Sequence, residues 1–250
     1  MRFERPLVEG ILLARRWRFF ADVRLADGTQ IVAHCTNTGR MTSCCEPGRR
    51  VWVSPRDPAS KARLRWTWEL IEMDAGLVGV NTARPNALVE EGLLANRFPE
   101  LEGYVTLYRE VAYGENSRID VLLEGAAGLC YVEVKNVSLC EGGVAMFPDA
   151  VSERAQKHLV ELTEMVRQDH RAVMFYAVNR GDARAFSVAD HVDPDYGIAY
   201  RKARKAGVES VAYRIKHTPR ALSWGARVPI EVSAEPPARV ARTKRSRAKS

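Results

Sequence analysis

The sequence predicts an α/β chain (α+β overall), in which a small all-β domain precedes an α/β domain. Residues 1–81 hold five short runs rich in β-branched and aromatic residues, at 7–14, 19–25, 30–35, 50–54 and 65–72. Turn-forming pairs such as Asp27-Gly28 and Pro47-Gly48 separate these runs. Because this number of strands suits a small closed barrel, we expect an OB-like β-barrel over residues 1–81 that binds nucleic acid.

Residues 82–235 show helical and strand patterns in alternation, which indicates an α/β domain. Pro85 stands at the start of one helical pattern, Asp149 suits the N-cap of a longer helix, and Asp193-Pro194 opens a third that Gly207 closes. The strands expected between these helices cover residues 109–113, 117–123, 130–135, 172–178 and 208–215.

The residues with the clearest chemistry lie in a predicted hairpin at 117–135. Alternation along a strand places Glu133 and Lys135 on one face, and pairing across the hairpin sets Asp120 beside Glu133. Two carboxylates can hold Mg²⁺ (or Mn²⁺), and a nearby ammonium can stabilise charge on a phosphate. We therefore predict a nuclease-like site with Asp120, Glu133 and Lys135 as catalytic residues. The alternative is a solvated strand face on which Glu133 and Lys135 balance each other.

A third carboxylate would complete this acidic cluster. The helix that begins near Pro85 carries Glu90 and Glu91, one of which could point along the helix edge toward Asp120. Glu110, in the strand before the hairpin, is a further candidate. Pattern alone leaves the choice among the three open.

Two groups of residues are candidates for binding nucleic acid. In the barrel, Trp66 with Arg16, Arg18 and Arg65 could form a cationic face on which unpaired bases stack, together with Trp52 and Trp68. The alternative is that these tryptophans form the barrel core. In the helix after Asp149, Arg154, Lys157 and His158 lie three and four residues apart, a spacing that would let them bind a phosphate group. The alternative is that they form an ordinary solvent-exposed helix surface.

The positive charge of the chain is concentrated at its two ends. Net charge is +4 over residues 1–81, −3 over 82–235 and +6 over 236–250, which gives the total of +7. Residues 236–250 have few apolar side chains, so we predict a disordered basic tail suited to a polyanion such as DNA. An odd number of cysteines, five, and the lack of a long apolar run favour a cytoplasmic protein without a membrane span. Nothing in the sequence indicates whether chains pair.

Several motifs together resemble those of the bacterial and archaeal sugar fermentation stimulation protein (SfsA) family. They include Pro6-Leu-Val-Glu-Gly10, Ala33-His34-Cys35, Asn37-Thr-Gly39, Thr67-Trp-Glu-Leu70, Val80-Asn-Thr82, Ser117-Arg-Ile-Asp120, Tyr131-Val-Glu-Val-Lys-Asn-Val137 and Phe147-Pro-Asp-Ala-Val151. The resemblance implies an N-terminal OB-like domain and a PD-(D/E)XK nuclease-like domain, with metal positions at Asp120 and Glu133 and with Glu91 as the helix carboxylate. It also implies DNA binding with little sequence preference and a regulatory link to maltose metabolism.

The sequence thus leaves two functions open. One is a Mg²⁺-dependent nuclease of the PD-(D/E)XK type that acts on DNA, with single-stranded DNA as one candidate form. The other is a non-enzymatic DNA-binding regulator of sugar metabolism that retains a nuclease fold.

Overall fold

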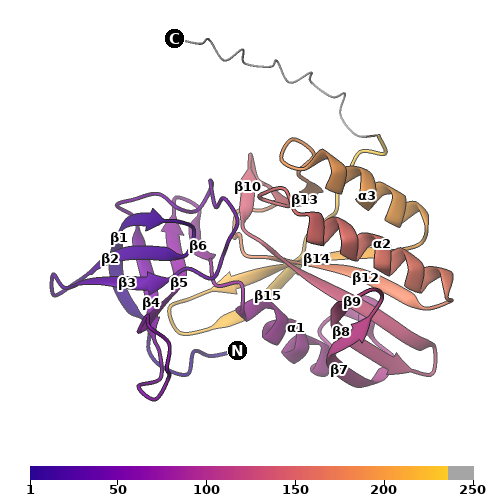
Figure 1. Ribbon diagram of the computed structural model, residues 1–250, viewed down its shortest axis with the longest axis horizontal. Helices are drawn as coiled ribbons and strands as arrows, with labels where there is room; N and C mark the ends of the chain where they lie inside the picture. The colour runs from indigo at the N-terminus through magenta and orange to yellow at the C-terminus, as the bar shows by residue number, and fades with distance from the viewer. Residues whose placement is uncertain (236–250) are drawn as a thin grey trace, which may run out of the picture.

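The computed structural model describes residues 1–235, and the predicted basic tail at 236–250 lies outside these described residues. Figure 1 shows a barrel beside a larger α/β domain, with the start of the chain between them. Within the described residues, no helix is both long and apolar enough to cross a membrane.

The first domain is the OB-like barrel that the sequence predicts. Strand β1 pairs with both β2 and β4, and a parallel pairing between β3 and β5 closes the barrel. Its strands are β1 (Val8–Arg16), β2 (Phe20–Leu25), β3 (Gln30–His34), β4 (Arg50–Pro55), β5 (Trp66–Met73) and β6 (Gly76–Gly79). Buried Leu12, Val23, Val51 and Trp68 lie in its core, so apolar burial holds the closed sheet together.

The second domain is a six-stranded sheet with helices on both faces. The sheet order is β15-β14-β12-β9-β8-β7, with β9, β12 and β14 parallel at its centre. The strands are β7 (Tyr104–Tyr113), β8 (Ser117–Gly125), β9 (Gly128–Val137), β12 (Arg171–Val178), β14 (Glu209–His217) and β15 (Leu222–Arg227). A small sheet of β10 (Leu139–Glu141), β11 (Val144–Phe147) and β13 (Ala185–Val188), which the sequence patterns did not predict, adjoins it.

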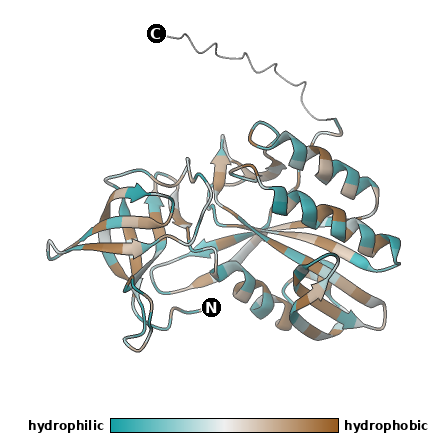
Figure 2. Cartoon of the chain, viewed as in Figure 1, coloured by the Kyte–Doolittle hydropathy of each residue, from teal (hydrophilic) through white to brown (hydrophobic). Residues whose placement is uncertain are grey.

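Each face of the central sheet has its own apolar core. Helices α2 (Glu153–Arg167) and α3 (Pro194–Lys205) pack on one face, and α1 (Arg84–Leu94) packs on the other, with a 3₁₀ turn at Pro99–Leu101. Figure 2 shows hydrophobic residues along the strands, whereas α2 and α3 carry both hydrophobic and hydrophilic ones. Amphipathic helices of this kind bury one side on the sheet and leave the other in solvent.

The start of α2 differs from the sequence prediction. Ser152, not Asp149, is the N-cap, and its side chain accepts a hydrogen bond from the Ala155 amide. The Asp149 carboxylate instead accepts from the Met41 amide of the barrel, 3.3 Å away. A sequence window around the helix cannot reveal this partner, which is 108 residues away in the chain.

A loop of the barrel fixes the two domains against each other. Asn37 donates to the hydroxyl of Ser138, which follows β9, and the Ser43 hydroxyl donates to the Ser138 carbonyl. Arg180 reaches back from the α/β domain to the Ser43 carbonyl at 2.8 Å. These bonds hold the barrel beside the end of β9, the strand that carries Glu133 and Lys135.

Candidate metal and nucleic-acid site

Asp120 lies where the β8–β9 hairpin stops pairing. The ladder runs from Gly125–Gly128 to Val121–Val132. One residue further, Oδ2 of Asp120 accepts a hydrogen bond from the Val134 amide at 2.8 Å. Its other oxygen, Oδ1, accepts from the side-chain amide of Asn86 in α1 at 2.7 Å. The carboxylate is therefore held in a fixed position between β8, β9 and α1.

Glu133 is almost completely buried, yet only one of its two carboxylate oxygens has a partner. Oε1 accepts from the Lys135 ammonium at 2.6 Å and from Nδ1 of His158. Oε2 is buried with no hydrogen-bond partner. A buried charged oxygen without a partner is costly, so Oε2 is the atom that most needs a ligand here.

The two carboxylates affect each other's protonation. Burial and the neighbouring charge of Glu133 raise the pKa of Asp120 to about 6. Burial alone would raise the pKa of Glu133 as well, but Lys135 and His158 outweigh it and leave that pKa below its usual value. The charges of Asp120 and Glu133 thus influence each other, and near neutral pH both carboxylates are ionised.

Three residues of α2 were expected to bind phosphate, and one of them, His158, is buried instead of exposed. Its ring is buried against Glu133, donates through Nδ1 and accepts at Nε2 from Arg154 at 3.4 Å. The prediction that His158 offers a surface for nucleic acid is therefore wrong, because the ring positions Glu133. Arg154 and Lys157 remain exposed, and the Lys157 ammonium lies 3.4 Å from Glu161.

None of the three predicted candidates for a third carboxylate contacts Asp120. Glu91 is exposed and pairs with the amino group of Met1 at 2.8 Å, and Glu90 pairs with Arg109 at 3.1 Å. Glu110 is exposed on β7. Within residues 1–235, no group of three or more His, Cys, Asp or Glu side chains is arranged to hold a metal ion. The helix instead reaches the carboxylate pair through Asn86, which the sequence patterns did not single out.

Tyr113 and Glu161 are two further polar side chains that sequence reasoning missed. The Tyr113 hydroxyl and Oε2 of Glu161 are both buried without a partner. Burial, followed by the charges of Glu133, Glu161 and Asp120, raises the pKa of Tyr113 above its usual range. The hydroxyl therefore stays protonated and can donate a hydrogen bond toward this acidic region.

The barrel residues proposed to stack bases mostly have structural roles. Trp52 and Trp68 are buried and Trp66 is half-buried, so these tryptophans belong to the barrel wall rather than to a surface. Arg65 donates to three carbonyls of its own loop, those of Asp57, Pro58 and Ser60. Arg16 forms a bidentate pair with Asp22, and the Arg18 guanidinium donates to the Thr38 carbonyl at 3.3 Å.

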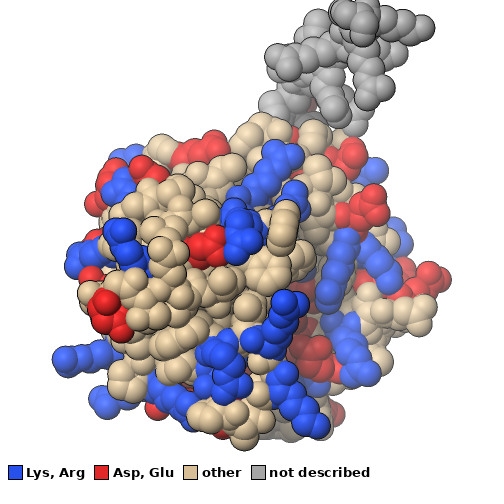
Figure 3. Space-filling model, turned by 60° about the vertical axis from the view of Figure 1, so that its left-hand side comes forward, with Lys and Arg blue, Asp and Glu red and all other residues tan. Residues whose placement is uncertain are grey.

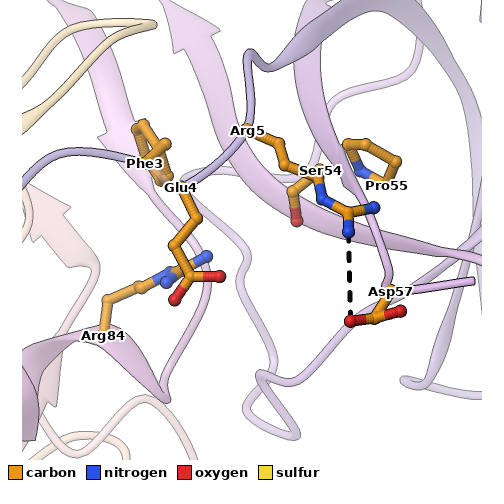
Figure 4. A pocket seen from close by; sticks show the side chains of 7 residues that line it. All are labelled: Phe3, Glu4, Arg5, Ser54, Pro55, Asp57 and Arg84. Atoms are coloured by element: carbon orange, nitrogen blue, oxygen red, sulfur yellow. Dashed lines mark ion pairs between the residues drawn. The ribbon is translucent and has the colours of Figure 1, made fainter. Parts of the chain in front are cut away.

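A separate small pocket of about 100 Å³ lies between the start of the chain and the barrel (Figure 4). Arg5 faces Asp57 across it at 3.9 Å. Its lining residues are Phe3, Glu4, Arg5, Ser54, Pro55, Asp57 and Arg84. None of the predicted site residues lines this pocket, so it is distinct from the carboxylate site.

Two family models together match most of the chain. Residues 13–80 match the SfsA N-terminal OB domain, and residues 83–221 match the sugar fermentation stimulation protein RE domain. The chain belongs to the SfsA family. Among its relatives, the sugar fermentation stimulation protein homolog of Geobacter sulfurreducens is 52% identical over 230 residues, which cover 92% of this chain and 98% of the relative. The homolog of Paramagnetospirillum magneticum is 47% identical over 234 residues, covering 93% and 99% of the two chains.

A solved structure of the family has the same fold. The chain aligns with Pyrococcus furiosus SfsA with a TM-score of 0.84 and 29% identity, over 92% of this chain and 98% of that one. That archaeal protein was solved in complex with Ca²⁺. The resemblance inferred from the motifs is thus confirmed for the family and for the fold.

Proposed function

We propose that this SfsA-family protein binds DNA with little sequence preference and cuts its backbone with Mg²⁺ or Mn²⁺ held by Asp120 and Glu133. The observation that carries the proposal is the buried, unpartnered Oε2 of Glu133 beside Asp120. Hard divalent cations bind carboxylate oxygens of this kind and keep several waters. The complex of the Pyrococcus furiosus relative with Ca²⁺ supports a divalent cation. DNA as the substrate would place the activity in the cytoplasm.

The donor set fits a cation that uses few protein ligands. Asp120 supplies a carboxylate that Asn86 and the Val134 amide hold in place, and Glu133 supplies the free Oε2. Glu91 is not part of this set, because its carboxylate pairs with the amino group of Met1. A cation bound there would lower the pKa of a bound water and neutralise charge on the phosphate.

The remaining residues have roles that follow from their contacts. Lys135 is only slightly exposed, and its ammonium keeps Glu133 ionised while lying close enough to the site to stabilise charge on a phosphate oxygen. His158 fixes the orientation of Glu133 by donating to Oε1. Arg154, exposed and in contact with His158, can bind the flanking phosphate.

A cleavage assay tests this proposal. Wild-type protein and the Asp120→Ala and Lys135→Ala variants are purified in the same way and incubated with single-stranded and duplex oligonucleotides plus Mg²⁺ or Mn²⁺. The proposal expects cleavage by wild type that needs the cation and is lost in both variants. Equal cleavage by wild type and Asp120→Ala would contradict it, as would the absence of any cleavage.

The second candidate is a non-enzymatic DNA-binding regulator of sugar metabolism, including that of maltose. It is favoured by the lack of a third carboxylate within residues 1–235 that could complete a metal cluster. This function predicts DNA binding that persists in EDTA and in Lys135→Ala and that weakens steeply with salt. Binding that does not change between low and high salt would count against it.

A further inference from the structure

The turn between β1 and β2 exposes two aromatic side chains at the edge of the barrel. Trp17 is 75% exposed and Phe19 is 48% exposed, whereas most large apolar side chains of the barrel are buried. The Trp17 ring contacts Phe20 edge-on, with 6.0 Å between ring centres, so it has one supporting neighbour and a free face. Leaving these two aromatic side chains in water forgoes the free energy that burying them would contribute, and nothing in the packing of the barrel requires their exposure.

The backbone of this turn is also unusual. Trp17 and Arg18 both have left-handed backbone conformations, with φ of 47° and 66°. Glycine and asparagine adopt this conformation easily, whereas bulky residues are disfavoured in it by a steric clash of their Cβ atoms. A tryptophan and an arginine here cost stability, and a residue that costs stability and lies in solvent points to a binding role.

Positive charge surrounds the exposed ring. Residues 15–20 read Arg-Arg-Trp-Arg-Phe-Phe, with three arginines and no acidic residue. Arg16 is neutralised by Asp22 and lies 5.6 Å from the centre of the Trp17 ring. Arg15 and Arg18 instead donate to main-chain carbonyls of residues 37–40. Their charges act on the Asp149 carboxylate without an ion pair to it, so both can still contact an anion. Figure 3 brings the left-hand side of the molecule forward and shows many Lys and Arg side chains over it, with Asp and Glu side chains between them.

The turn is connected to the carboxylate site through the barrel loop that Arg15 holds. Gly39 of that loop lies so close to the Asp149 carboxylate that a Cβ on Gly39 would overlap it, and Asp149 lies three residues before the N-cap of α2. The first turns of α2 carry Arg154 and His158, which contact each other and then Glu133. The turn that carries Trp17 is thus linked, through the loop at Gly39 and through Asp149, to the start of the helix that carries Arg154.

We propose that Trp17, supported by Arg15 and Arg18, is a stacking platform for an unpaired base of single-stranded nucleic acid. Paired bases in a duplex are already stacked and hide their faces, so a free indole favours a single strand. This inference deepens the proposed function, because it rests on nucleic acid as the ligand and names the strand form. Stacking on Trp17 supplies contact with the base, and the arginines supply contact with the backbone.

Fluorescence titration in EDTA tests the platform without depending on cleavage. Trp17 is the most exposed of the five tryptophans, since Trp52 and Trp68 are buried and Trp66 and Trp224 are half-buried. A single-stranded oligothymidylate should quench the emission of wild type, and Trp17→Phe should lose most of that quenching. Trp17→Ala should weaken binding about tenfold and Trp17→Phe less, because phenylalanine keeps a ring that can stack.

Tyr108→Ala is the matched control. Tyr108 is also an exposed aromatic residue, 44% exposed, but it lies on β7 in the α/β domain. Its removal should leave binding unchanged. Equal affinity of wild type and Trp17→Ala would overturn the platform, as would quenching by anionic lipid vesicles or by duplex alone. Loss of cleavage in Asp120→Ala together with unchanged binding by Trp17→Ala would overturn the platform while sparing the nuclease proposal.

Discussion

The side-chain amide of Asn86 in α1 donates a 2.7 Å hydrogen bond to Asp120 in β8, across 34 residues of sequence. The helix thus approaches the carboxylate pair with an amide and not with a third negative charge. Two carboxylates repel each other less than three would when no cation is bound. They also leave more coordination positions of a bound cation free for water and phosphate.

The first prediction compares Asn86 with Glu91. Asn86→Ala should weaken Mn²⁺ binding about tenfold, because it removes the bond that orients Asp120. Glu91→Gln should leave Mn²⁺ binding and cleavage unchanged, since Glu91 pairs with the amino group of Met1. Calorimetric titration of Mn²⁺ into both variants measures this. A large loss in Glu91→Gln alone would restore Glu91 as the helix carboxylate.

The second prediction concerns the stability cost of Asp120. Its folded-state pKa, about 6, lies above the ordinary value of 3.8, so the folded state binds this proton more tightly than the unfolded state does. The free energy of unfolding therefore falls as pH rises from about 4 to 6, by up to about 3 kcal/mol. Asp120→Asn should then gain about 1–3 kcal/mol at pH 7 and little at pH 4, while cleavage is lost.

Urea unfolding at the two pH values measures the gain. Asparagine at position 120 can keep both hydrogen bonds: its oxygen accepts from the Val134 amide, and its NH₂ group donates to Asn86 once the Asn86 side-chain amide rotates by half a turn. Packing therefore changes little. A variant that is less stable than wild type at pH 7 would show that Asp120 does not carry this cost.

The third prediction is the pH dependence of cation binding. Because the proton on Asp120 must leave before a cation binds, affinity should fall about tenfold per pH unit below pH 6 and level off above it. Ca²⁺ titrations between pH 5 and pH 8 follow this, with Asp120→Asn as the control in which the pH dependence disappears. An affinity that is flat across pH 6 would argue against Asp120 as a ligand.

The fourth prediction separates the structural role of Lys135 from its catalytic role. Lys135→Met leaves the buried charge of Glu133 with less compensation and should cost about 3 kcal/mol of stability at pH 7. Glu133→Gln with Lys135→Met should cost less than the sum of the two single changes, because no charge is then left buried. Thermal unfolding of all four proteins gives the coupling, and strictly additive costs would rule out the pair as a stabilising contact.

The sequence predicted the elements whose signal is local. Strand alternation found the hairpin that carries Asp120 and Glu133, and turn residues separated the barrel strands correctly. The short strands β10, β11 and β13 were missed because three or four residues carry too little periodicity.

The site residues that were missed or misplaced depend on distant contacts. Helical spacing does not fix the rotation of α1, so it left the third carboxylate open. The family resemblance implied Glu91, whose partner, the amino group of Met1, lies 90 residues away. Helical spacing places His158 on the surface of α2, because the sequence does not show that Glu133 of the sheet packs against its ring. Trp66 and Trp68 alternate in β5 and so share one face, a pattern that already favours a barrel wall, whereas Trp17 lies in a turn without periodicity.

The shared cation is tested most directly by anomalous diffraction from crystals soaked in Mn²⁺. One strong peak bonded to an oxygen of Asp120 and to Oε2 of Glu133 is expected, and it should vanish in Asp120→Asn crystals. A Mn²⁺ peak elsewhere, with Oε2 of Glu133 still unpartnered, would contradict the proposal that these two carboxylates hold a cation.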